Sequence, residues 1–208
     1  MEYRVFIGGT EYGMKDIESA AIESPLFDKL SAGNACSAQL EISFWPLGTV
    51  PRMAEIIPQA RNSADEEWVT LGTFYTDERS TSVGGKMSII AYDSMLKSEV
   101  VWTPENEQDF PMSMSDAVTK IAQLMKIGID ARTEIESGDY YKIDYPANDY
   151  TLRDVLRFIA SAHMGNWIIT ANNELLLVPL FSSMPDPTNY LVDENGNAIT
   201  FGGVRITV

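Results

Sequence analysis

Residues 36–44 are Cys36-Ser37-Ala38-Gln39-Leu40-Glu41-Ile42-Ser43-Phe44, an unbroken alternation of apolar and polar side chains. A period of two is typical of a β-strand that buries one face and exposes the other. Trp45-Pro46 ends the pattern. The segment therefore predicts a strand of a half-buried sheet, with Cys36 on the apolar side as a buried, inert thiol. The polar face of this strand consists of Ser37, Gln39, Glu41 and Ser43.

The sequence around this strand predicts a β-rich first half. Residues 1–9 indicate a strand that ends in a Gly-Gly turn, and further strands are expected near residues 68–75 and 85–92. Residues 46–66 contain three prolines and an acidic run, which favour a loop between strands. Residues 94–102 are compatible with a helical turn or with a further strand.

The composition changes between Pro104 and Pro111, and helical periodicity follows. One helix is expected over residues 116–127, with Ser113 or Ser115 as its cap and Gly128 as its stop. A second helix is indicated by Thr151 and Asp154, which have the spacing of a capping box. Its apolar positions lie on one helix face, and Gly165 is expected in the left-handed conformation after its end. These apolar positions are Leu152, Val155, Leu156, Ile159 and Ala162.

Two hairpins complete the expected α+β fold. The first pairs residues 167–170 with 175–180, and the second lies within residues 190–201, with Asn195-Gly196 at its tip. The chain is expected to end in a strand over residues 204–208. We therefore expect a β-rich, barrel-like domain and a smaller helix-plus-hairpin part. The expected divisions are 1–104, 105–184 and 185–208.

The charge of the chain excludes several classes of partner. Thirty acidic and fifteen basic residues give a net charge of −15, and the acids are spread over both halves. A field of this sign repels phosphate, so specific binding to nucleic acid or to an anionic membrane surface is not expected. No apolar run is long enough for a membrane-spanning helix, and the N-terminus lacks the pattern of a secretory signal. Self-association has to overcome this repulsion, so higher salt is expected to favour it.

No pattern of residues indicates catalysis or metal binding. The chain has one cysteine and one histidine, which excludes an intramolecular disulfide and every two-histidine metal motif. His163 is interpreted as a cap or packing residue at a helix end, because no nucleophile motif accompanies it. The segment from Asp193 lacks the glycine and the glutamate of a calcium loop, and Gly84-Gly85-Lys86 lacks the spacing of a phosphate-binding loop.

Two further groups of residues have simple structural interpretations. The acid pairs among thirty carboxylates arise by chance, and a glycosidase would need two of them at a defined separation. These acids are Asp65, Glu66, Glu67, Asp77, Glu78, Asp139, Asp144 and Asp149. Tryptophans form core more often than carbohydrate platforms; they are Trp45, Trp68, Trp102 and Trp167. We therefore predict no enzyme and no catalytic, cofactor-binding or metal-ligating residue.

Several blocks of the sequence resemble one family of proteins. Residues 33–44, then 71–75 and 87–93, and later 150–156 through 175–180 are similar to the N-terminal part of bacteriophage and prophage baseplate hub proteins, which are tail-associated and late control protein D-like. The resemblance covers roughly residues 33–180, and it lies in ordered blocks rather than in a catalytic motif.

The resemblance implies a structural virion protein without a cofactor. Such hubs are trimers whose tube-type β-barrels form a pseudo-sixfold ring between the tail tube and the tip. The expected partners are further copies of the chain, in a homotrimer, and other tail proteins, while DNA passes through the channel unbound. The expected location is the virion tail, assembled in the bacterial cytoplasm, with no membrane insertion. The chain ends at Val208, about where a second barrel would be expected.

Two alternatives remain open at this point. The chain could be the N-terminal part of a tail-associated peptidoglycan hydrolase, or a carbohydrate-binding module at the tail tip. If the hub interpretation holds, part of the negative charge is expected to line the DNA channel, because a lumen rich in carboxylates does not retain phosphates. The polar face of residues 37–43 is the expected lining.

Overall fold

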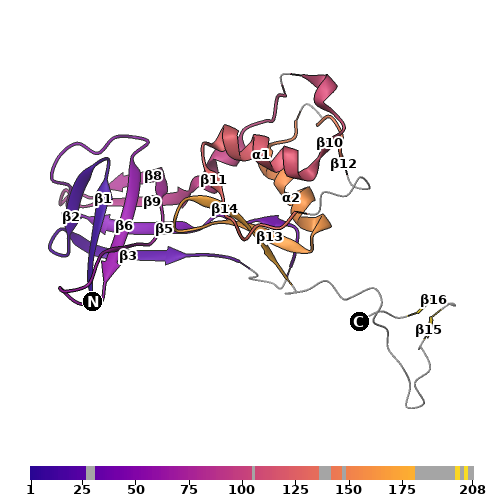
Figure 1. Ribbon diagram of the computed structural model, residues 1–208. Coiled ribbons are helices and arrows are strands. Elements are labelled where there is room, and N and C mark those ends of the chain that lie inside the picture. The colour runs from indigo at the N-terminus through magenta and orange to yellow at the C-terminus, as the bar shows by residue number, and fades with distance from the viewer. Residues whose placement is uncertain are drawn as a thin grey trace, which may run out of the picture.

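The computed structural model describes residues 1–26, 31–104, 106–135, 142–146, 149–180, 200–201 and 204–205. Figure 1 shows a barrel-like sheet beside a smaller part that contains helices and a second sheet. The fold is β-rich with a small helical part, as the sequence predicts.

The barrel-like sheet has eight strands and is nearly closed. Its order is β2-β1-β6-β8-β9-β5-β3, all neighbours are antiparallel, and β7 pairs with β6. The strands are β1 (Glu2–Ile7), β2 (Thr10–Gly13), β3 (Ile17–Glu23), β5 (Gln39–Phe44), β6 (Glu55–Arg61), β7 (Val69–Thr70), β8 (Phe74–Thr81) and β9 (Met87–Asp93).

The apolar side of the alternating stretch fills the barrel. Leu40, Ile42 and Phe44 of β5 are buried in one hydrophobic cluster with residues from β1, β6, β8 and β9. The ring of Tyr12 meets that of Phe44 edge-on at 4.9 Å between centroids. Burial of these side chains is the main force that holds the sheet in this curved form. The strands predicted within residues 1–9, over residues 36–44 and over residues 85–92 are therefore confirmed as β1, β5 and β9, although β5 begins only at Gln39.

The prediction of a loop over residues 46–66 is wrong, because β6 occupies residues 55–61. A proline interrupts a sheet only where its missing N–H is needed. β6 pairs with β8 through residues 55–56 and with β7 through residues 59–60, so Pro58 lies at the gap between these two neighbours. Its carbonyl still accepts a hydrogen bond from the backbone N–H of Leu71, at 2.9 Å.

The single strand predicted over residues 68–75 is divided into β7 and β8 by Gly72. This glycine has a φ of +149°, and a Cβ at its position would lie 2.9 Å from the ring of Phe74. A side chain at residue 72 would thus meet the core residue that begins β8.

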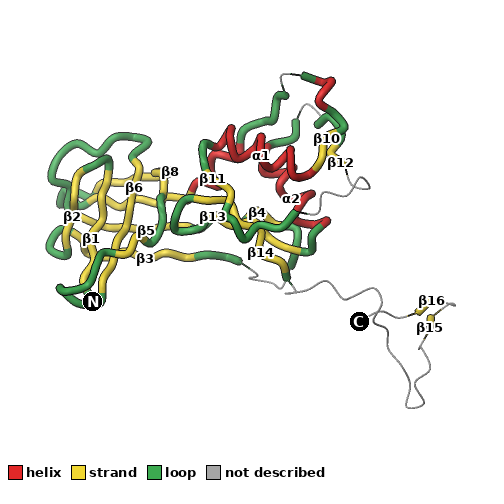
Figure 2. The backbone as a smooth tube through the Cα atoms, in the orientation of Figure 1, coloured by secondary structure: helices red, strands yellow, loops and turns green. Residues whose placement is uncertain are grey.

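The second part of the molecule is built on a four-stranded sheet with the order β11-β14-β13-β4. Figure 2 shows this part beside the barrel, with its helices in red next to its strands in yellow. Its elements are β4 (Asn34–Ala35), the 3₁₀ helices η1 (Ser94–Glu99) and η2 (Glu107–Asp109), β10 (Met112–Ser113), α1 (Met114–Met125), β11 (Gly128–Ile129), β12 (Lys142–Ile143), α2 (Leu152–Ala162), β13 (Gly165–Ile169) and β14 (Glu174–Pro179). A further pair, β15 (Thr200–Phe201) and β16 (Val204–Arg205), is antiparallel.

The two α-helices begin at the predicted caps. Ser113 Oγ accepts a hydrogen bond from Asp116 N at 3.0 Å, so Ser113 rather than Ser115 caps α1. Thr151 and Asp154 form the full capping box of α2, with 3.1 Å and 3.0 Å between donor and acceptor. The carboxylates of Asp116 and Asp154 also lie in the first turns of their helices, where the helix dipole favours a negative charge.

The helix ends differ from the prediction. Lys126 takes the left-handed conformation that ends α1, with φ +58°, two residues before Gly128. After α2 it is Met164, with φ +47°, and not Gly165, that is left-handed. Gly165 begins β13 instead, and a Cβ there would lie 2.8 Å from the carbonyl oxygen of Val178. The glycine is needed for close approach of the two strands.

Gly165→Ala is therefore expected to destabilise the protein by about 1–3 kcal/mol, because the added methyl group forces β13 away from β14. Urea unfolding at constant pH measures this cost. Gly48→Ala is the matched control, since Gly48 has no atom within 4 Å of a built Cβ. Equal stability of the two variants would contradict the close-approach argument.

The second hydrophobic cluster draws on both halves of the chain. It joins the buried faces of α1 and α2 to Trp167 and Leu175, and it includes Ala35 and Met95. β4 pairs in parallel with β13, which brings Asn34 and Asn166 into register. The division at residue 104 stays a prediction. The first predicted hairpin is confirmed as β13 and β14, and the second, within residues 190–201, falls almost wholly outside the described residues.

Candidate functional site

The outer face of the barrel over β3, β5, β9 and β8 is polar and acidic. Residues that pair directly across antiparallel strands project to the same side of a sheet. The register therefore places three rows of side chains on the face opposite the core. The rows are Ser19, Ser43, Ser88 and Ser80; Ala21, Glu41, Ile90 and Glu78; and Glu23, Gln39, Tyr92 and Tyr75. We call these twelve residues the outer face.

Short polar contacts organise this outer face. Ser43 Oγ and Ser88 Oγ lie 2.8 Å apart, and Gln39 donates to a carboxylate oxygen of Glu41 at 2.7 Å. Three of the twelve residues are glutamates and none is a lysine or an arginine. Such a surface offers acceptors and negative charge, and at one end of it Lys97 Nζ lies 4.1 Å from the ring centroid of Tyr75. The polar residues predicted from the sequence, Gln39, Glu41 and Ser43, belong to it.

The fourth predicted polar residue, Ser37, belongs instead to a network at the junction of the two parts. Asp93 ends β9 and caps η1, and its carboxylate is almost fully buried. It accepts hydrogen bonds from Ala38 N at 2.8 Å, Met95 N at 2.9 Å and Ser37 Oγ at 3.0 Å. Burial raises the pKa of Asp93 to about 6, and these donors offset only part of that effect.

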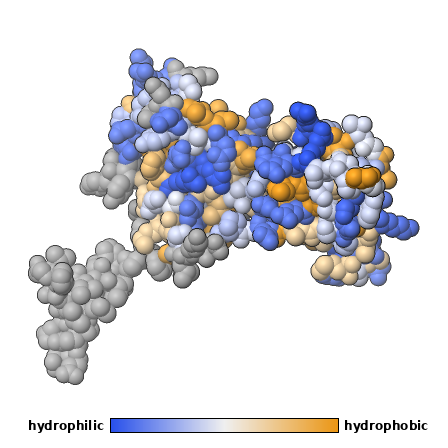
Figure 3. Space-filling view, turned by 180° about the vertical axis from the view of Figure 1, so that it is seen from behind, coloured by the Kyte–Doolittle hydropathy of each residue, from blue (hydrophilic) through white to orange (hydrophobic). Residues whose placement is uncertain are grey.

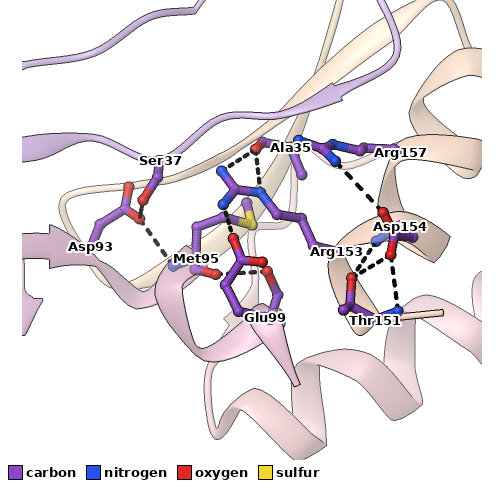
Figure 4. Close-up of polar contacts among 10 residues, drawn as sticks. Ala35, Ser37, Asp93, Met95, Glu99, Thr151, Arg153, Asp154 and Arg157 are labelled. Carbon is purple, nitrogen blue, oxygen red and sulfur yellow. Dashed lines mark hydrogen bonds and ion pairs between the residues drawn. The ribbon is translucent and has the colours of Figure 1, made fainter. Parts of the chain in front are cut away.

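Arg153 of α2 lies on the other side of this junction. Its guanidinium donates to the carbonyl oxygen of Ala35 from Nε at 3.0 Å and from Nη2 at 2.7 Å, and it forms an ion pair with Glu99. Figure 4 shows Arg153 reaching from α2 to Ala35, while Arg157 points to Asp154. One side chain thus joins α2, η1 and β4. These bonds hold the elements of the junction together, and among the described residues no buried side-chain nitrogen or oxygen lacks a hydrogen-bond partner.

A hollow of about 560 Å³ lies beside this junction, with Cys36, Tyr92 and Arg153 among its lining residues. The predicted burial of Cys36 is confirmed. Burial raises the pKa of the Cys36 thiol, although Arg153 acts in the opposite direction. A thiol of this kind is a poor nucleophile at neutral pH.

The other candidate residues from the sequence analysis, which are His163 and the acid pairs, lie in different parts of the molecule. His163 ends α2, and its Nδ1 lies 2.9 Å from the carbonyl oxygen of Ile159. The acids of residues 65–67 and 77–78, with Asp144 and Asp149, are exposed. Asp139 and the segment from Asp193 lie outside the described residues. Within the described ranges, no three histidine, cysteine or acidic side chains are placed to hold a metal ion.

The tryptophans divide into two pairs. Trp102 and Trp167 are buried in the second hydrophobic cluster, as expected of core residues. Trp68 lies between Arg4 and Arg61, with each guanidinium carbon 4.4 Å from the ring centroid. Trp45 is exposed. Among the helices that the structure describes, none is long and apolar enough to cross a membrane.

Solved structures share this fold at low sequence identity. The chain is similar to the 43 kDa tail protein of prophage MuSo2 from Shewanella oneidensis, with a TM-score of 0.55 and 13% identity over 96% of this chain and 61% of that one. A tail protein from Neisseria meningitidis MC58 matches with a TM-score of 0.56 and 17% identity over 95% and 59%. Prophage tail protein gp18 from Listeria monocytogenes EGD-e matches with a TM-score of 0.50 and 11% identity over 95% and 64%.

No protein-family model matches the sequence, and no curated protein sequence is significantly similar to it. The chain spans about three fifths of the length of the solved structures that it matches. At these identities the likeness is one of fold. The chain thus has the fold of the shared part of three prophage tail proteins.

Proposed function

We propose that this protein is a structural component of a phage or prophage tail, and that it acts in the baseplate hub between the tail tube and the tip. The observation that carries the proposal is the shared fold, because three solved tail proteins each match at least 95% of the chain. The sequence blocks that resemble baseplate hubs, within residues 33–180, belong to the barrel and to the smaller helical part. Its partners are then other tail proteins and further copies of the chain, as a homotrimer.

The outer face supports a place beside the DNA channel. Glu23, Glu41 and Glu78 would repel the DNA backbone, while the four serines add uncharged polar groups between them. DNA would pass such a lining without the multiple phosphate contacts that retain it. We propose that this face lines the channel, and that the chain does not bind DNA specifically.

A structural role also fits the chemistry of the described residues. The junction joins its polar groups to one another, Cys36 is buried, and Nδ1 of His163 lies 2.9 Å from the carbonyl oxygen of Ile159. The proposal therefore includes no enzymatic activity. The hydrolase alternative would need a reacting group outside these residues, and the carbohydrate alternative would depend on Trp45.

The proposal predicts that the protein is part of assembled particles. Mass spectrometry of gradient-purified tails from an induced lysogen is expected to find it together with tail-tube protein. Its absence from intact tails would contradict the proposal. A zymogram on peptidoglycan is expected to show no lysis by the purified chain, whereas clear lysis would favour the hydrolase alternative.

A further inference from the structure

The carboxylate of Asp93 lies where the chain passes from the barrel to the helical part. Asp93 ends β9 and is followed by η1, while residues 36–38 connect β4 to β5 and belong to no strand. Ala38 N donates to Asp93 Oδ2 at 2.8 Å, and Ser37 Oγ donates to Oδ1 at 3.0 Å. Asp93 N in turn donates to the carbonyl oxygen of Ala38 at 3.1 Å. We call these bonds the Asp93 contact, and they hold the two connections side by side.

Asp93 differs from the other acids of the chain in its surroundings. Seen from behind, hydrophilic residues cover large areas of the surface (Figure 3), whereas Asp93 is only 4% exposed. Asp130 is the other buried acid among the described residues, and it forms an ion pair with Arg132 at 2.7 Å. No lysine or arginine of the described ranges forms an ion pair with Asp93. A buried carboxylate without a paired cation is destabilised when it is ionised.

The charged groups around Asp93 do not supply this cation. Arg153 of α2 acts to lower the pKa of Asp93, but its guanidinium is bound to a backbone carbonyl and to Glu99 of η1. Lys97 of η1 donates to a tyrosine hydroxyl of β8 at 2.9 Å. From the segment before β5, the thiol of Cys36 faces the carboxylate, and burial raises the pKa of this thiol. The other charged groups on the neighbouring elements are exposed or bonded elsewhere. They are Glu41 of β5, Asp77, Glu78 and Arg79 of β8, Asp116 and Lys120 of α1, and Asp154 and Arg157 of α2.

The hollow of about 560 Å³ gives water a route to one side of this carboxylate. Its lining includes Cys36 and Ser37, so it borders the segment that connects β4 to β5. Ser37 and Ala38 are half-buried, whereas Met95, on the other side of the carboxylate, is fully buried in the second hydrophobic cluster. Packing therefore holds the bond from Met95 N, and the bonds to residues 37–38 separate at a lower cost.

The contact accommodates a neutral carboxyl better than an ionised one. A backbone N–H only donates, but a hydroxyl both donates and accepts. With a proton on Oδ1, Asp93 donates to Ser37 Oγ, and Ala38 N still donates to Oδ2. The neutral form thus keeps its partners while it is buried. The ionised form gains free energy from contact with water.

We propose that the Asp93 contact is a pH-sensitive hinge between the barrel and the helical part. The hinge is closed while Asp93 carries a proton, and residues 37–38 separate locally from the carboxylate when it is ionised. Burial raises the pKa of Asp93 to about 6 in the closed state, and access of water returns this pKa toward its ordinary value near 3.8. Opening is therefore favoured as the pH rises, by about tenfold between pH 5 and pH 7. This property does not depend on the proposed role in a tail.

Hydrogen exchange measured by NMR between pH 5 and pH 7 tests this hinge. After correction for intrinsic exchange rates, the protection of the Ala38 amide is expected to fall about tenfold over this range. It should also stay at least about tenfold below that of the Cys36 amide, because local opening costs less than global unfolding. The Cys36 amide is the internal reference, since it donates to the carbonyl oxygen of Trp167 at 2.8 Å and not to Asp93.

Two variants assign the effect to one carboxyl. Asp93→Asn removes the titrating group, so the protection of Ala38 should no longer depend on pH. Asp77→Asn is the matched control, because Asp77 is exposed on the adjacent strand β8 and its loss should leave the pH dependence unchanged. The same comparison removes any contribution from His163, which ends α2.

Each outcome decides the question. A fall in the protection of Ala38 that is kept in Asp77→Asn and lost in Asp93→Asn supports the hinge. Constant protection of Ala38, a fall that persists in Asp93→Asn, or equal protection of Ala38 and Cys36 overturns it.

A measurement on the unmodified chain replaces the variant if Asp93→Asn does not fold. The carboxyl carbon signal of Asp93 is then followed by NMR as the pH changes. A midpoint between pH 5 and pH 7, at which the protection of Ala38 also changes, supports the hinge. A midpoint outside this range overturns it.

Discussion

Replacing Trp167 by alanine is expected to destabilise the protein by about 3–5 kcal/mol, the usual cost of removing a large buried aromatic side chain. Trp167 is 0% exposed, and its indole N–H donates to the carbonyl oxygen of Leu156 at 2.8 Å. It also pairs with Ala35 across β13 and β4. The substitution removes apolar contacts and leaves a cavity, and it leaves one buried carbonyl without its side-chain donor.

Chemical unfolding measures this effect directly. Trp45→Ala is the matched control, because it deletes the same side chain from a position that is 46% exposed. Its cost is expected to stay below about 1 kcal/mol. A Trp167→Ala variant as stable as Trp45→Ala would mean that the second hydrophobic cluster is packed differently from the structure.

Lowering the pH from 7 to 5 is expected to stabilise the protein through Asp93. The pKa of this carboxyl is raised to about 6 because it is buried, against an ordinary value near 3.8. The folded state therefore binds a proton more tightly than the unfolded state between these two values. The resulting contribution to stability is fully present below the unfolded pKa and is lost as the pH rises through about 6. It amounts to about 1 kcal/mol between pH 7 and pH 5.

Asp93→Asn tests the assignment of this effect. The amide has the size of the carboxyl and does not titrate, so the stability gain on acidification should disappear in the variant. The carboxyls of Asp130 and Asp154 act in the opposite sense, since Arg132 lowers the pKa of the first and Thr151 that of the second. Their contributions are lost only at more acidic pH, so the window from pH 7 to 5 isolates Asp93. An unchanged gain in Asp93→Asn would contradict the buried-carboxyl account.

Local patterns in the sequence predict the elements whose burial is regular. The alternation of residues 36–44 gives β5, and the capping box of Thr151 gives α2, because both signals depend on neighbours in the chain. β3 shows no alternation, since only Ile17 among its seven residues is buried. β4 is two residues long and exists through its pairing with Asn166 and Trp167, far along the chain. No local pattern marks either strand.

The candidate site is only partly visible in the sequence for the same reason. The polar residues of β5 follow from the alternation, but the outer face also needs the register of three other strands. Asp93 follows a strand and precedes a helical turn, which is a signal for a capping residue. Its bond to Ser37 joins positions 56 residues apart, and only the fold brings them together. The position of Pro58 likewise depends on where β7 ends and β8 begins.

A cryo-electron microscopy map of the assembled tail tests the central claim most directly, because that claim gives the protein a structural place and no reaction. The account predicts density for the barrel around the channel, with Glu23, Glu41 and Glu78 turned toward the lumen. A map in which this outer face points away from the channel, or which holds no density for the chain, would contradict it.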